Sequence, residues 1–190
     1  MQVERSAAAE GVLFMASFTN VFFSKNAPTF IFMKAESLNE IKQEIKNLSA
    51  KEITELCLRL ARYKKENKEL LSYLLFDAHD IDSYIVRIKE SIDESFNDMN
   101  KSNVYLAKKT LRKILRQVNK QARFTLSKQT EIELRIHFCS TLKTSGIMLQ
   151  KNKTLANMYG QQIKKIKTAL TGLHEDIQYD YIKQLEQLNR

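Results

Sequence analysis

Glycine and proline are scarce in this chain of 190 residues, which contains four glycines and one proline. A strand-rich protein needs turns roughly every 8–12 residues, and these two residues build many of them. The four glycines are also isolated from one another, so the sequence lacks a glycine-rich loop that holds phosphate. These shortages argue against a strand-rich fold and predict an all-α protein.

Cysteine is equally scarce. Cys57 and Cys139 do not form a CxxC pair, and no histidine lies at the spacing of a zinc finger. Each cysteine lies among apolar residues at helical spacing, so we interpret both as buried thiols in a reducing compartment. We therefore expect a cytoplasmic protein that has no cofactor and no metal site.

Long apolar runs are absent as well. A membrane-spanning helix needs about eighteen or more consecutive apolar residues, and the sequence has no such run. We therefore expect no membrane partner. The content of 43% hydrophobic and 28% charged residues is ordinary for a globular protein. A chain of this length is large enough to bury a core, and we predict a single helical domain over residues 33–190.

Residues 1–32 differ in composition from the rest of the chain and hold six of its ten phenylalanines. A signal peptide needs a basic start and an uninterrupted apolar core, whereas here acids flank Arg5 and Thr19 and Asn20 interrupt the apolar segment. Met33 offers a second start for the protein. We interpret residues 1–32 as a disordered extension or a mis-assigned start, with a signal peptide or a membrane- or partner-inserting segment as alternatives.

From Ser37 onward, apolar residues recur every three or four positions, which predicts helices throughout. Short connections favour an irregular antiparallel bundle of about seven or eight helices. α-Solenoid-like helix pairs are the alternative, although the sequence shows no fixed repeat. Ser49, Asp80 and Ser127 are predicted helix caps, and Ser145–Gly146 is a predicted helix end. The helices run roughly over 38–47, 50–60, 67–76, 81–96, 104–123, 128–144, 154–170 and 177–188.

Two segments are expected to contribute strongly to the core. Residues 67–76 are apolar nearly all round a helix, so we predict a central position for them. The helix after Ser49 has one apolar face, which we also predict to be buried. The residues of that face are Ile53, Leu56, Cys57 and Leu60.

The positive charge of the chain is concentrated in one stretch. Between Met99 and His174 there are sixteen Lys or Arg residues and only two acids, Glu131 and Glu133. The formal net charge of +9 therefore arises from this stretch. A localised positive field restricts the partners to anionic ones, or to the chain's own acidic part.

The helix predicted over residues 104–123 places its charges on one face. At about 100° per residue, the apolar residues lie in one arc and the cations in the opposite arc. Phosphate groups bind such rows of cations, and an aromatic residue among them can stack on an unpaired base. The predicted anion- or nucleic-acid-binding residues are Lys109, Arg112, Lys113, Arg116, Lys120, Arg123 and Tyr105.

Two further observations bear on this basic face. Five lysines on, or just before, the helix predicted over 154–170 extend this basic face if the two helices are neighbours. They are Lys151, Lys153, Lys164, Lys165 and Lys167. The acids between Asp77 and Asp98 give a second interpretation, in which the basic face is neutralised within the chain. A hairpin of the two adjacent helices would place these acids beside the cations. An ordinary solvated helix face is the third interpretation.

Two clusters of carboxylate and histidine side chains are candidate metal or catalytic sites. Asp77, His79, Asp80 and Asp82 gather carboxylates and an imidazole, but their spacing fits neither an EF-hand nor an HExxH site, and we interpret these aspartates as helix-ending and capping residues. Glu133 and His137 lie one turn apart, and we interpret them as a surface pair. We therefore predict a non-enzymatic binding module for an anionic partner, with nucleic acid favoured. A protein-interaction scaffold is the first alternative, and a carboxylate–histidine metalloprotein is the second.

Overall fold

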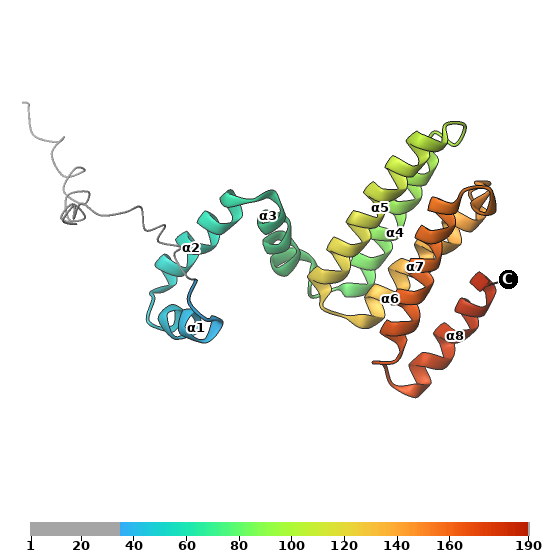
Figure 1. Ribbon diagram of the computed structural model, residues 1–190. Helices are drawn as coiled ribbons and strands as arrows, with labels where there is room; N and C mark the ends of the chain where they lie inside the picture. The colour runs from blue at the N-terminus through green and yellow to red at the C-terminus, as the bar shows by residue number, and fades with distance from the viewer. Residues whose placement is uncertain (1–34, 190) are drawn as a thin grey trace, which may run out of the picture. The chain divides into compact units, whose positions relative to one another are not determined.

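The computed structural model describes residues 35–189, which form eight α-helices and no β-strand (Figure 1). The prediction of an all-α helical bundle is therefore confirmed. The interpretation of residues 1–32 concerns residues outside the described range. The helices are α1 (Leu38–Lys46), α2 (Ala50–Tyr63), α3 (Lys65–Ser72), α4 (Ile81–Asn97), α5 (Val104–Thr125), α6 (Lys128–Thr144), α7 (Lys153–Leu170) and α8 (Glu175–Asn189). A π-helical turn, η1 (Tyr73–Asp77), follows α3, and a 3₁₀ turn, η2 (Leu149–Lys151), precedes α7.

The described part of the chain divides into two units, and the boundary lies between Asn47 and Leu48. In the first unit, Ser37 caps α1, because its backbone amide donates to Glu40 Oε2 over 2.8 Å and its hydroxyl accepts from the Glu40 amide. The Ser37 hydroxyl also donates to Glu40 Oε2 over 2.6 Å, and the hydrogen bonds from this hydroxyl and from the Ser37 amide lower the pKa of the Glu40 carboxyl. The second unit contains α2 to α8 and the hydrophobic core. The single domain over residues 33–190 stays a prediction.

Short polar motifs set the helix ends, as the sequence predicts. Ser49 and Glu52 form a reciprocal capping box at the start of α2, with a distance of 2.8 Å from Ser49 N to Glu52 Oε2. Asp80 accepts from the Ser83 amide at the start of α4, and Ser127 caps α6 in the same way. Helix α6 ends at Ser145, and Gly146 follows it with a positive φ of 79°.

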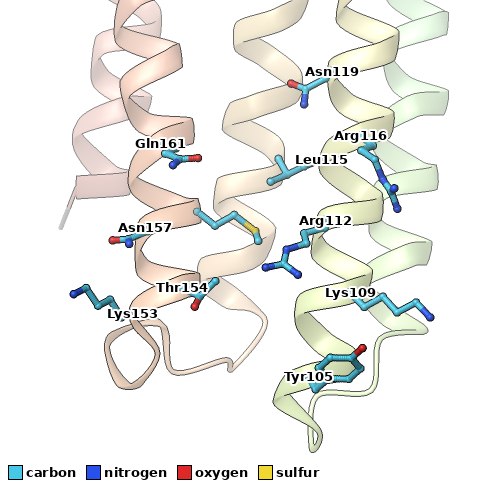
Figure 2. Close-up of a pocket in the computed structure, with 11 residues that line it drawn as sticks. Tyr105, Lys109, Arg112, Leu115, Arg116, Asn119, Lys153, Thr154, Asn157 and Gln161 are labelled. Atoms are coloured by element: carbon cyan, nitrogen blue, oxygen red, sulfur yellow. The ribbon is translucent and has the colours of Figure 1, made fainter.

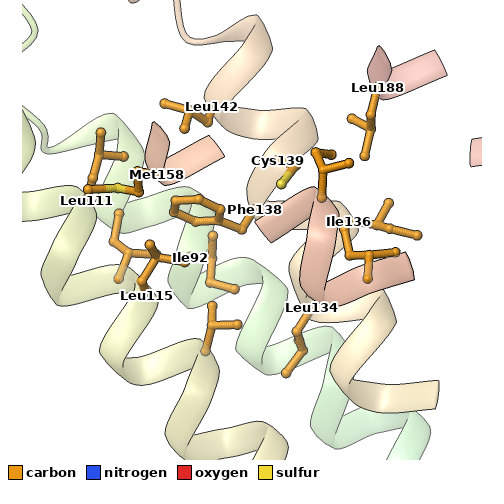
Figure 3. Packing of buried hydrophobic residues seen from close by; sticks show 14 of the residues in the cluster. Ile92, Leu111, Leu115, Leu134, Ile136, Phe138, Cys139, Leu142, Met158 and Leu188 are labelled. Atoms are coloured by element: carbon orange, nitrogen blue, oxygen red, sulfur yellow. The ribbon is translucent and has the colours of Figure 1, made fainter. Parts of the chain in front are cut away.

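Helix α6 is the centre of the second unit, because α4, α5, α7 and α8 all pack against it. Its apolar residues therefore point in several directions, and each meets a neighbouring helix (Figure 3). Phe138 lies against Phe96 of α4, with ring centroids 5.6 Å apart. In the described part of the chain, no helix is long and apolar enough to cross a lipid bilayer, α6 included.

The two segments expected to add to the core do so only weakly. In η1, Tyr73 packs on Tyr84 and Phe124, but Leu74, Leu75 and Phe76 are 56%, 63% and 69% exposed. Helix α2 packs mainly on α3 and has no buried residue. The central position of residues 67–76 and the burial of the α2 face were therefore wrong. Apolar periodicity shows which face of a helix can be buried, but burial also requires a neighbouring element to cover it.

Leu126 links α5 to α6 in a left-handed backbone conformation, with φ of 53°, and its side chain is 91% exposed. This conformation costs an L-residue about 1–2 kcal/mol, while glycine adopts it freely. We expect Leu126→Gly to raise the free energy of unfolding by about 0.5–1 kcal/mol, since the larger entropy of unfolded glycine offsets part of the gain. Urea denaturation measures this change.

Leu126→Ala is the matched control. It removes the same exposed side chain but keeps the backbone penalty, so we expect its stability to stay close to that of the wild type. Equal stability of the glycine and alanine variants would contradict the backbone explanation.

Candidate functional site

A groove with a volume of about 880 Å³ lies between α5 and α7, which both pack on α6 (Figure 2). Leu115 of α5 and Met158 of α7, both nearly buried, contribute apolar surface to it. The remaining lining residues are polar, and none is acidic. They are Tyr105, Lys109, Arg112, Arg116 and Asn119 from α5, and Lys153, Thr154, Asn157 and Gln161 from α7.

The core face of α5 orients the cations. The apolar residues of this face are buried, apart from Val104 at the helix start, so the opposite arc points outward as predicted. Asn103 begins the helix, because its side-chain oxygen accepts from the amides of Tyr105 and Leu106. Tyr105 is thereby held at one end of the groove with its ring 74% exposed. The buried residues of α5 are Ala107, Leu111, Ile114, Leu115, Val118, Ala122 and Phe124.

The structure divides the predicted basic face into two parts. Four of its residues line the groove between α5 and α7, namely Tyr105, Lys109, Arg112 and Arg116. Of these, Arg112 is directed toward α7 in Figure 2, whereas Lys109 and Arg116 extend along the other side of α5. The other predicted residues face α3, where Arg116 is also found. They are Lys113, Lys120 and Arg123.

The cations on the α3 side are partly neutralised. Lys120 Nζ lies 2.6 Å from Glu69 Oε2, and the Lys120 side chain is only 17% exposed. Arg123 Nη2 lies 3.7 Å from Glu66 Oε1. Two of the predicted binding residues are therefore paired with acids of α3, which offset their charge.

The acids of residues 77–98 have different partners from those anticipated. Asp77 pairs with Arg87, and Asp93 Oδ1 lies 2.7 Å from His137 Nε2 of α6. Among the ion pairs of the described residues, none joins the acids of residues 77–98 to the cations of α5. Neutralisation of the basic face by this acidic segment was therefore wrong, because Asp77 and Asp93 have other partners and the remaining acids of the segment form no ion pair among the described residues.

The cations along the α5–α7 groove remain exposed. None of them is paired with an acid within residues 35–189. Of the α7 lysines proposed to extend the basic face, Lys153 lines this groove. Lys164 and Lys165 line an adjacent groove with α6, and Lys151 and Lys167 line neither groove. The unpaired cations are Lys109, Arg112, Arg116 and Lys153.

A buried arginine below the groove was missed in the sequence. Arg135 of α6 is 4% exposed and donates to Glu131 Oε1 over 2.6 and 2.8 Å. It also donates to Asn119 Oδ1 of α5 over 2.9 Å and to Gln162 Oε1 of α7 over 2.5 Å. One guanidinium therefore ties together the three helices that form the groove. Its position within the apolar run of α6 was the available signal.

Asn157 and Gln161 were also missed. They follow Lys153 at four-residue intervals along α7, so they share its face and line the groove with it. This polar spacing was readable in the sequence. The spacing does not predict a groove, however, unless α7 is known to lie beside α5.

Glu133 and His137, one of the two candidate clusters, each contact other residues of the protein. Glu133 accepts from Tyr181 over 2.8 Å and pairs with Lys89 over 3.2 Å, while His137 pairs with Asp93. The interpretation of Glu133 and His137 as a pair was therefore wrong. Burial, together with the hydrogen bond to Glu133, raises the pKa of Tyr181 to about 12. Residues 35–189 contain no group of three or more His, Cys, Asp or Glu placed to hold a metal ion.

Asp77–Asp82 forms the junction between η1 and α4. Asp80 accepts from the Ser83 amide over 3.1 Å, and hydrogen bonding from the side chain and from the backbone amide of Ser83 lowers the pKa of the Asp80 carboxyl. Asp77 pairs with Arg87, as described above. Both residues therefore end or begin a helix, as predicted from the sequence.

The chain was compared with protein-family models, curated proteins and solved structures, and none of the three comparisons gave a significant match. The fold and the groove therefore define this protein only as an α-helical bundle with a basic groove. Cys139 offers no nucleophile, because burial raises the pKa of its thiol to about 12.

Proposed function

We propose that this protein is a non-enzymatic nucleic-acid-binding module, and that the groove between α5 and α7 binds the phosphate backbone. The observation that carries the proposal is a groove bordered by four exposed cations and no acid. Arginine and lysine bind phosphate by charge neutralisation and counterion release, and arginine adds bidentate geometry. The free thiols Cys57 and Cys139 support our proposal of a cytoplasmic location.

The division of the basic face refines which cations contribute. Lys109, Arg112, Arg116 and Lys153 line the groove without an acidic partner among residues 35–189, whereas Lys120 and Arg123 are paired with α3. The unpaired cations can bind phosphates without breaking an ion pair. Lys120 and Arg123 can bind phosphate only after their ion pairs with Glu69 and Glu66 break. We therefore assign the phosphate contacts to the unpaired cations and a structural role to Lys120 and Arg123.

Two triple variants test this assignment at equal net charge. We expect K109Q/R112Q/K153Q to lose most of its affinity for a labelled oligonucleotide, because it removes three of the four unpaired cations of the groove. We expect K113Q/K120Q/R123Q, the matched control, to keep most of its affinity. Fluorescence anisotropy at about 50 mM salt measures both. Four phosphate contacts in this groove alone correspond to a fall in affinity of about 50- to 150-fold between 50 and 200 mM salt.

The alternatives predict different results. If neither DNA nor RNA binds at about 50 mM salt, the nucleic-acid proposal is wrong. Equal losses in the two triple variants would show that overall charge, not the groove, attracts the oligonucleotide. A protein-interaction scaffold, the alternative from the sequence, instead predicts a protein partner whose binding tolerates high salt.

A further inference from the structure

We infer that the α5–α7 groove is one half of a longer track, which runs along α7 and holds a single strand of nucleic acid. This inference rests on the proposed function and specifies its ligand. The second half is the adjacent groove between α6 and α7. It is lined by Lys128, Glu131, Arg135, Gln161, Lys164, Lys165, Thr168 and Ala169.

The two grooves adjoin at a shared residue. Gln161 lines both of them, and it lies midway along one face of α7. Lys153 marks one end of that face and Thr168 the other, and the residues between them recur at three- and four-residue intervals. At about 1.5 Å per residue, the face is about 22 Å long. The track is therefore much longer than either groove alone.

The second groove continues the positive charge of the first. Lys128, Lys164 and Lys165 are all exposed, and none is ion-paired with a residue in the described range. Glu131 is the one acid in the lining, and Arg135 holds its carboxylate through two hydrogen bonds. The two grooves together thus present seven exposed cations, namely Lys109, Arg112, Arg116, Lys128, Lys153, Lys164 and Lys165.

The shape of the track favours a single strand over a duplex. A duplex is read by a helix or ribbon that projects into a groove of the nucleic acid, and its bases face one another. Here the protein surface is concave, with apolar Leu115 and Met158 between basic rims. Unpaired bases can contact such apolar surface while the cations follow the backbone. The exposed ring of Tyr105 at one end supplies a stacking platform.

The track is also rigid where its halves meet. Arg135 lies in the lining of the second groove and donates to Asn119, which lines the first. It also binds Gln162 of α7, next to the shared Gln161. The three helices that border the track are therefore joined by one buried network at the junction, so the track is preorganised for a ligand.

The test uses the full chain with oligo-dT and oligo-rU probes of about 3, 7 and 14 nucleotides, and a 14-base-pair duplex. Stacked bases rise about 3.4 Å each, so about seven nucleotides span the track. We expect the 7-mer to bind nearly as tightly as the 14-mer, the 3-mer to bind more weakly, and the duplex to bind more weakly than the 14-mer. Seven contacts to a single strand predict a loss of about 10³-fold in affinity between 50 and 200 mM salt.

Two pairs of variants separate the halves of the track. In K164Q/K165Q the loss of affinity between 50 and 200 mM salt should fall from about 10³-fold to about 10²-fold, because two phosphate contacts are removed. The control K51Q/K68Q removes two exposed lysines outside both grooves and should leave this salt dependence unchanged. Y105A should weaken binding by about 5- to 150-fold, and Y105F, which keeps the ring, should not.

The possible results distinguish the two proposals. If no probe binds at about 50 mM salt, the proposed function and the track both fail. If the probes bind but K164Q/K165Q behaves like K51Q/K68Q, the groove between α5 and α7 binds alone and the track is overturned. Tighter binding of the duplex than of the 14-mer would overturn the single-strand ligand in the same way.

Discussion

Phe138→Ala is expected to destabilise the second unit by about 3–5 kcal/mol, the largest effect of any single change considered for this protein. Phe138 has no exposed surface and packs on Phe96 where α4 meets α6. Removing its ring eliminates the transfer free energy of a large side chain and leaves a cavity in the central helix. Domains are stable by only about 5–15 kcal/mol in total, so this loss is a large part of the whole.

Chemical denaturation followed by circular dichroism measures the effect. The denaturant midpoint should fall with little change in slope, and the melting temperature should drop by about 8–16 °C for a unit of this size. Phe76→Ala is the matched control, because it removes the same ring from a side chain that is 69% exposed. Its free energy of unfolding should stay within about 0.5 kcal/mol of the wild type.

This pair of variants also tests the architecture. The sequence pattern alone predicts a central position for residues 67–76, and in that arrangement Phe76→Ala is the costly change. The structure places α6 at the centre instead. A larger loss for Phe76→Ala than for Phe138→Ala would show that the arrangement of helices described here is incorrect.

Arg135→Met is expected to have the second-largest effect, a loss of about 2–4 kcal/mol in the free energy of unfolding. Methionine keeps most of the volume of the side chain but none of its donors. The variant leaves the buried Gln162 carbonyl without its partner and removes the charged hydrogen bonds to Glu131 and Asn119. Hydrogen bonds to charged groups contribute about 1.5–3 kcal/mol each, and a buried orphan acceptor costs about 1–3 kcal/mol.

A double variant separates the contributions. In R135M/Q162L the orphan carbonyl is removed as well, so we expect part of the lost stability to return. Arg116→Met, an exposed arginine without an ion pair among residues 35–189, is the control and should change stability by less than about 0.5 kcal/mol. Wild-type stability of Arg135→Met would mean that the desolvation of the buried guanidinium cancels its hydrogen bonds.

Local features were predicted well because their causes are local. The capping box at Ser49, the cap at Asp80 and the end of α6 at Gly146 depend on residues within a few positions of one another. The apolar arc of α5 was also correct, since the helical period alone determines which residues share a face.

The candidate site was predicted only in part. The sequence identified the basic arc of α5 but treated its residues as equivalent. The structure assigns Arg112 to an open groove and Lys120 to an ion pair with Glu69. Asn119 and Arg135 were missed because their roles depend on contacts between helices that are far apart in the sequence.

Three properties of this protein are predictable from its residues alone: the all-α class, the ends of most helices, and the concentration of positive charge between Met99 and His174. These properties follow from composition and from interactions over one or two helical turns. The central position of α6, the groove between α5 and α7, and the partial neutralisation of the basic face by α3 instead depend on how the helices pack. Burial and charge pairing are properties of neighbouring surfaces, and a periodic pattern does not specify which helix supplies the neighbour.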